Sequence, residues 1–193
     1  MVGAISKWLL NSQETNGKRC ISSINNNNWS QYTALVHSRL DYCNVVFASL
    51  PACDIQRLQS VLITAVRLVA GSSRHDHVTS LLRDRHWLPV KQRVEYKLCM
   101  MVHRCLYGDA PSYLADLITP SVAATVRPGL RSAASSSVAV PRTISSLGDR
   151  SFAAAGPRAW NTLPPPLRRV YSPDTFKRQL KTFLYNHAFN LHC

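Results

Sequence analysis

Acidic residues are scarce in this sequence of 193 residues. Only 10 Asp and Glu stand against 23 Lys and Arg, so the formal net charge is +13. The carboxylates are scattered singly, and no two of them are adjacent. Two-metal phosphoryl transfer needs paired carboxylates that hold two ions about 4 Å apart. The sequence therefore predicts no polymerase or nuclease activity in this chain, and no catalytic residue.

The motifs of other enzyme classes are missing too. There is no Gly-x-Ser-x-Gly elbow, no phosphate-binding Gly-x-x-x-x-Gly-Lys loop and no Gly-x-Gly-x-x-Gly turn. We therefore expect that the chain is not an enzyme and uses no cofactor. No apolar run approaches the roughly 20 residues that cross a bilayer, so we expect no membrane partner.

The six cysteines have no framework spacing, and no secretory signal precedes them. We therefore expect reduced thiols in a nuclear or cytoplasmic protein. Two groups suggest zinc ligands: His75, His77 and His86, and then Cys99, His103 and Cys105. Neither group has paired Cys-x2-Cys spacing or a matching second half, so we expect no bound metal. The alternative is core thiols and imidazoles in loops or at the surface.

Positive charge is the strongest feature that is present. Residues 118–193 carry 10 basic groups against only Asp149 and Asp174. Such an excess favours a polyanionic partner, because each neutralised phosphate releases counterions. The alternative is a solvated basic surface that serves solubility.

The spacing of apolar residues predicts a mainly α fold, a helical thumb-like bundle with a small irregular or β segment. We expect a disordered leader at 1–30, a helical region at 31–118, a loop-rich linker at 119–147 and a C-terminal helical extension at 148–193. The helices are expected at residues 31–50, 54–70, 78–83, 90–107, 111–118 and 174–189, with short helical turns in 146–163 and a strand at 138–140. Leu62, Leu98 and Phe183 are the expected core contacts of the three longest clear helices.

Two basic triplets are the candidate nucleic-acid-binding residues. Arg93, Lys97 and Arg104 align on one helix beside its apolar face, and Lys177, Arg178 and Lys181 make the outer stripe of the last helix. The buried stripe of this last helix is expected at Phe176, Leu180, Phe183, Leu184 and His187. Aromatic residues near cations, namely Trp87, Tyr96 and Trp160, are candidate base-stacking groups, although each is more often a core or rim residue.

Ten strings then occur in an order that resembles a known family. They are SRLDYCN (38–44), IQRLQ (55–59), AVRLVAG (65–71), DHVTSLL (76–82), HWLPVKQR (86–93), YKLCMMVHRCLYGDAPSYLADLI (96–118), GLRSA (129–133), PRT (141–143), GDRSFAAAGPRAWNTLPPPLR (148–168) and TFKRQLKTFLYNHAF (175–189). The series resembles the C-terminal region of the reverse transcriptase of jockey-like non-LTR retrotransposons (LINE elements), over about residues 38–189.

The resemblance implies a region beyond the polymerase palm, made of thumb-like helices and a C-terminal extension that grip template RNA and primer DNA. Its partners would be RNA or DNA and, in an intact element, the upstream polymerase domain. The family's aromatic-x-Asp-Asp turn is absent, so no catalytic residue is carried over. The alternative is a host-adopted or non-functional fragment that acts, if at all, by binding an acidic protein.

Overall fold

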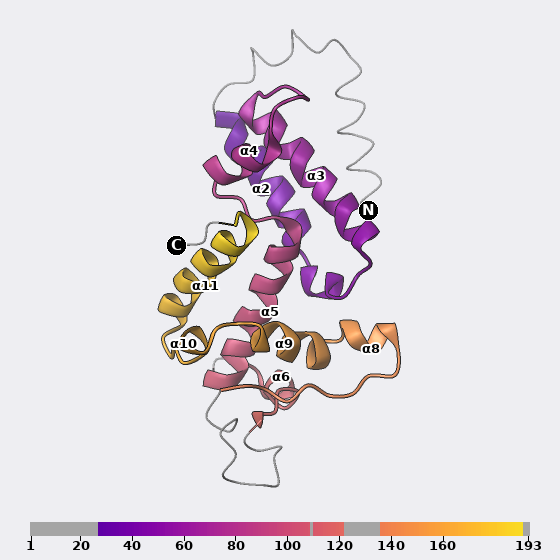
Figure 1. Cartoon of the computed structure of the whole chain (residues 1–193), viewed down its shortest axis with the longest axis vertical. Helices are drawn as coiled ribbons and strands as arrows, with labels where there is room; N and C mark the ends of the chain where they lie inside the picture. Colours follow the sequence, from indigo (N-terminus) through magenta and orange to yellow (C-terminus); the bar gives the residue numbers. More distant parts are fainter. Residues whose placement is uncertain (1–26, 109, 122–135, 191–193) are drawn as a thin grey trace. The chain divides into compact units, whose positions relative to one another are not determined.

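The computed structural model describes residues 27–108, 110–121 and 136–190, and these are mainly helical, as the sequence predicts (Figure 1). The chain divides into two compact units. The first contains the described parts of 1–42 and 51–90, and the second those of 43–50 and 91–193. The segments expected from the sequence have boundaries after residues 118 and 147. The two units of the structure instead divide the chain after residues 42, 50 and 90. The expected leader at 1–30 lies mostly outside the described residues.

The first unit is built around helix α3 (Ala52–Ala70), against which α2 (Asn27–Asp41) and α4 (Val78–Asp84) pack (Figure 1). The buried side of α3 repeats at three and four residues, as amphipathic helices do; it consists of Leu58, Val61, Leu62, Ala65, Val66 and Val69. The helix ends at Gly71, whose φ of 63° is left-handed. Glycine adopts this conformation without a Cβ penalty, so the predicted C-terminus of this helix is confirmed.

The connection after α4 belongs to the core of the first unit. Trp87 is buried, and its ring meets His37 edge-on with 4.3 Å between the ring centroids. Farther along, the Val90 N–H donates to Gln59 Oε1 at 2.9 Å. Trp87 is therefore a packing residue, which is the alternative that the sequence favoured over base stacking.

The helix expected at 31–50 is interrupted. Helix α2 ends at Asp41, and Cys43 has a left-handed φ of 51° before the 3-10 helix η1 (Asn44–Phe47). Periodicity does not reveal this break, because apolar residues continue at helical spacing through it. The break turns Asn44 and Ala48 inward and leaves Cys43 exposed.

The second unit is built around helix α5 (Val90–Tyr107), which has the predicted bounds. Val94 and Leu98 form an apolar cluster with Ala48 and with Ala155 of α9 (Phe152–Asn161). A Cβ placed on Gly156 would lie 2.9 Å from Val102 Cγ2. Glycine at this position therefore lets α9 approach α5 closely.

Helix α11 (Pro173–Ala188) packs against α5 through aromatic rings. His103 is fully buried and stacks on Phe176 with 4.2 Å between the ring centroids. Phe176, Leu180 and Leu184 are buried as predicted, whereas Phe183 is only half-buried and His187 is exposed. The buried stripe predicted for α11 was therefore too wide. Its five residues span more of the helix circumference than the contact with α5 buries.

The remaining described residues form short helices and connections. Helices α6 (Ser112–Ala115), α8 (Ser146–Arg150) and α10 (Pro165–Arg168) are each a single turn or little more. The expected strand at 138–140 is an isolated antiparallel bridge between Val138 and Pro120, and no strand occurs in the described part of the chain. On its other edge Val138 bonds α9: its N–H donates to Asn161 Oδ1 at 3.0 Å.

Candidate nucleic-acid interface

The first basic triplet lies along α5. Lys97 and Arg104 are exposed, and Arg93 is half-buried. Their spacing of four and seven residues keeps them within about 40° round the helix axis, and the row is about 16 Å long. The structure therefore places these three cations in one row, as the sequence predicts.

Lys97 and Arg104 are exposed because the core uses the other sides of α5. Val94 and Leu98 face the cluster with Ala48 and Ala155. His103 faces α11, and its Nε2 also donates at 2.9 Å to the carbonyl oxygen of Val170, which lies in the turn before α11. Arg104 follows His103 by one residue and is therefore turned about 100° from it round the helix axis, away from the contact with α11.

The second triplet divides between two sides of α11. Lys177 and Lys181 are exposed and one turn apart. Arg178 is also exposed, but it is turned about 100° from Lys177. It lines an open groove of about 530 Å³ between α10 and α11, whose apolar wall includes Leu167 and Phe183. The prediction of a single stripe therefore holds for Lys177 and Lys181 but not for Arg178.

Both triplets lie in the more basic of the two units. Residues 43–50 and 91–193 carry 14 Lys and Arg against 5 Asp and Glu, a net charge of +9. Residues 1–42 and 51–90 carry 9 Lys and Arg against 5 Asp and Glu, a net charge of +4. The field that would attract a polyanion is therefore strongest on the unit that holds the candidate residues.

Two carboxylates of this unit are engaged within the fold. Asp149 accepts hydrogen bonds from Thr143 and from Arg158, whose Nη2 lies 2.6 Å away. These bonds hold the pKa of Asp149 below its ordinary value, the bond from Thr143 contributing most. Burial raises the pKa of Glu95, although Lys91 and His187 act in the opposite direction.

The aromatic residues that were candidates for base stacking are mostly internal. Trp160 is fully buried, and its Nε1 donates to the Ser136 carbonyl oxygen at 3.0 Å, so it is a core residue, the alternative that the sequence favoured over base stacking. Tyr96 is half-buried. Sequence reasoning missed Tyr171, an exposed aromatic residue of this unit with 71% of its surface accessible. Its position two residues after Arg169 was the available signal.

The histidines and cysteines do not gather into a metal centre within residues 27–108, 110–121 and 136–190. Cys99 and His103 are both buried, and His103 is engaged with Phe176 and Val170. His75, His77 and His86 are exposed. These residues therefore offer packing groups and surface imidazoles rather than a ligand set.

No protein-family model, curated protein or solved structure matches this chain. In the described part of the chain, no helix is long and apolar enough to cross a membrane.

Proposed function

We propose that this chain binds RNA or DNA through the basic rows of its second unit. The observation that carries the proposal is the row of Arg93, Lys97 and Arg104, which lies outside the packed sides of α5 in a unit of net charge +9. Lys177 and Lys181 add a shorter row on α11. Phosphates repeat along a strand, so a row of cations can contact several of them, and contacts of this kind are largely independent of sequence.

We further propose that the chain corresponds to the C-terminal region of a jockey-like non-LTR retrotransposon reverse transcriptase. The ordered strings between residues 38 and 189 support this, and the mainly helical fold is compatible with a thumb-like region. In such a protein the rows would contact template RNA and primer DNA beside an upstream polymerase domain. The chain itself would then bind without catalysing, in a nuclear or cytoplasmic setting.

Salt dependence tests the binding. If about four to six phosphates are neutralised, raising salt from about 50 to 200 mM should weaken duplex binding by about two to three decades. Fluorescence anisotropy with labelled RNA and DNA duplexes of mixed sequence measures this. Affinity that is insensitive to salt would contradict the proposal.

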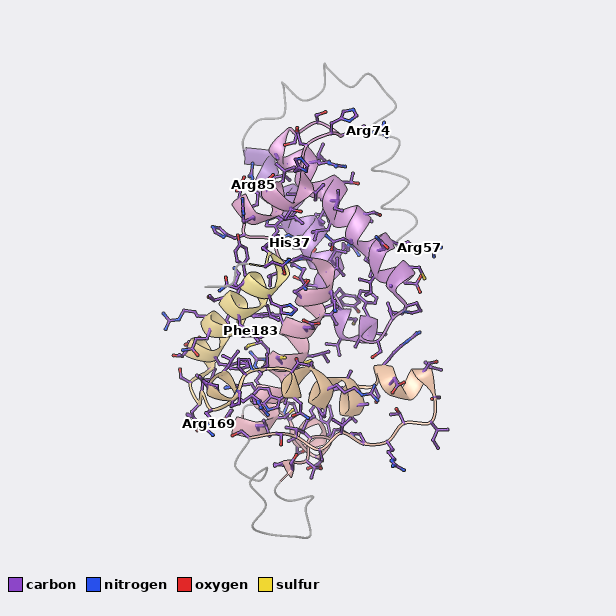
Figure 2. The ribbon with its side chains drawn as sticks, in the orientation of Figure 1. His37, Arg57, Arg74, Arg85, Arg169 and Phe183 are labelled. Atoms are coloured by element: carbon purple, nitrogen blue, oxygen red, sulfur yellow. The ribbon has the colours of Figure 1, made fainter. Side chains whose placement is uncertain are left out.

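A matched pair of triple variants tests the location. One replaces Arg93, Lys97 and Arg104 by Gln; the other replaces Arg39, Arg57 and Arg74, which are exposed in the first unit, two of them labelled in Figure 2. Both remove the same charge, but the first should cost far more affinity and lower the salt slope by about three. Equal losses would mean an unpatterned basic surface. Equally tight, competing binding of polyglutamate would favour an acidic protein partner instead.

A further inference from the structure

The turn from α10 into α11 is fixed to α5 by two hydrogen bonds from buried or half-buried rings. The Tyr107 hydroxyl donates to the Arg168 carbonyl oxygen at 3.1 Å, and His103 Nε2 donates to the Val170 carbonyl oxygen at 2.9 Å. His103 is itself held by stacking on Phe176. The backbone of residues 168–171 is therefore anchored at alternate positions.

This anchoring leaves two side chains directed outward. Arg169 and Tyr171 are exposed, and Figure 2 shows Arg169 at the outer edge of the turn. The Tyr171 ring meets Tyr107 nearly perpendicularly, with 5.1 Å between centroids and 79° between planes. Because that contact orients the ring while 71% of the residue stays accessible, little ordering remains for a ligand to impose.

The buried positive charge at the same turn is that of Arg168. Arg168 is 7% exposed, its buried Nε has no hydrogen-bond acceptor, and no acidic group among the described residues forms an ion pair with it. Burial, and then the neighbouring charge of Arg169, lowers the pKa of Arg168. An arginine nevertheless stays protonated in proteins. An anion bound at this turn would offset the repulsion between the two guanidinium groups.

From these observations we infer that the turn binds one unpaired nucleotide of single-stranded RNA or DNA. The base stacks on the accessible part of the Tyr171 ring, and the adjoining phosphate meets Arg169, with Arg168 behind it. A duplex covers its base faces, so it reaches the cations but not the ring. This inference rests on the proposed function and refines it, because it adds a preference for unpaired strands.

The test compares Tyr171→Ala with Tyr113→Ala in the full chain. Tyr113 is a matched control, since it is 69% exposed and lies on α6 of the same unit. The probes are fluorescein-labelled oligouridylate and oligothymidylate of 12 nucleotides, and a hairpin duplex with the same number of phosphates. Y171A should weaken single-strand binding by about 5- to 100-fold, as loss of one stacked base does, and change duplex binding less than about twofold. Y113A should change neither.

Two further variants separate stacking from charge. Tyr171→Trp should retain single-strand affinity, because any aromatic face stacks. Arg169→Gln should weaken both probes and lower the salt slope by about one, whereas Arg142→Gln, exposed in the same unit, should do so less. Circular dichroism of each variant confirms that the fold is intact.

Each outcome decides a different point. If Y171A and Y113A behave alike, or if Y171A weakens both probes equally, the inference is overturned while the proposed function stands. If the unaltered chain binds no probe at about 50 mM salt, the proposed function itself fails. A selective loss of single-strand binding in Y171A, restored in Y171W, supports the inference.

Discussion

Replacing Gly156 by Ala adds one methyl group where α9 meets α5. The new Cβ would lie 2.9 Å from Val102 Cγ2 and 3.0 Å from the Phe152 ring. The first distance is shorter than Cβ atoms adopt in proteins, and the second is tighter than most such contacts, since the optimum is about 3.5 to 4.0 Å. Val102 cannot easily turn aside, because it is fully buried and a β-branched residue has one strongly preferred rotamer in a helix.

Two effects of this substitution oppose one another. Alanine favours a helix interior over glycine by about 1 kcal/mol. Overpacking a well-filled core costs about 1 to 3 kcal/mol, and here the methyl group meets two neighbours at once. We therefore expect G156A to lower the free energy of unfolding by about 1 to 2 kcal/mol. At an exposed helical site the same change would instead raise it.

A double-mutant cycle with Val102→Ala isolates the contact. V102A alone should destabilise the protein through the cavity it leaves. In the double variant the new methyl group fills part of that cavity, so the combined loss should fall short of the sum by about 1 kcal/mol or more. Urea unfolding followed by circular dichroism measures all four proteins. Simple additivity, or a more stable G156A, would show that the two helices do not approach as closely as described.

Four other perturbations follow from the structure. Leu98→Ala should cost about 2 to 5 kcal/mol, because Leu98 is buried between Ala48 and Ala155; an unchanged unfolding midpoint would contradict this. In the native protein, iodoacetamide should modify the exposed Cys43 and Cys53 and spare Cys99, whose burial blocks access and raises its pKa; peptide mass spectrometry reads this out, and early labelling of Cys99 would refute its placement. The pKa of Asp149 is lowered in the fold, so its ionised form contributes stability above the ordinary value of about 4 and loses it as pH falls through the lowered value; unfolding curves of Asp149→Asn and the unaltered protein should therefore differ at pH 6 and converge in acid. Finally, the purified chain should not extend a primer on an RNA template with magnesium, because no paired carboxylates are present, and measurable extension would overturn that expectation.

The helices that apolar periodicity marks clearly were predictable. The repeat of buried residues in α3 and the glycine after it fixed both the face and the end of that helix. The bounds of α5 followed in the same way, with Pro89 before it and Gly108 after it. In both cases local propensity, capping chemistry and packing favour the same conformation, so the sequence is a sufficient guide.

Tertiary contacts decided what periodicity could not. The break at Cys43 interrupts a pattern that reads as continuous helix, because residues 43–50 pack with the second unit rather than the first. His187 has the helical position of a buried residue but is exposed, because α11 buries only Phe176, Leu180 and Leu184. The burial of Trp87 and Trp160 depends on partners far away in the sequence, namely His37 and Ser136.

The candidate site was predictable only as a set of cations. Spacing placed Arg93, Lys97 and Arg104 correctly on one row, since a helix fixes their angles. Spacing did not reveal that Arg178 would line the groove beside α10, because that depends on how α10 packs. Nor did it reveal Tyr171, whose exposure depends on the hydrogen bonds that anchor its turn.

The left-handed break at Cys43 also affects how the chain can be dissected. Because 43–50 belongs with 91–193, a fragment that starts at Lys91 would lose Ala48, Phe47 and Val45 from the cluster over Val94 and Leu98. It would expose that apolar face to water and become prone to aggregation. Cutting the gene at one place therefore cannot release the second unit intact. The folded second unit also contains a hydrogen bond from Ser49 to the carbonyl oxygen of Asp149, 100 residues farther along the chain. During synthesis on the ribosome, residues 43–50 therefore cannot complete their contacts until most of the chain has been made.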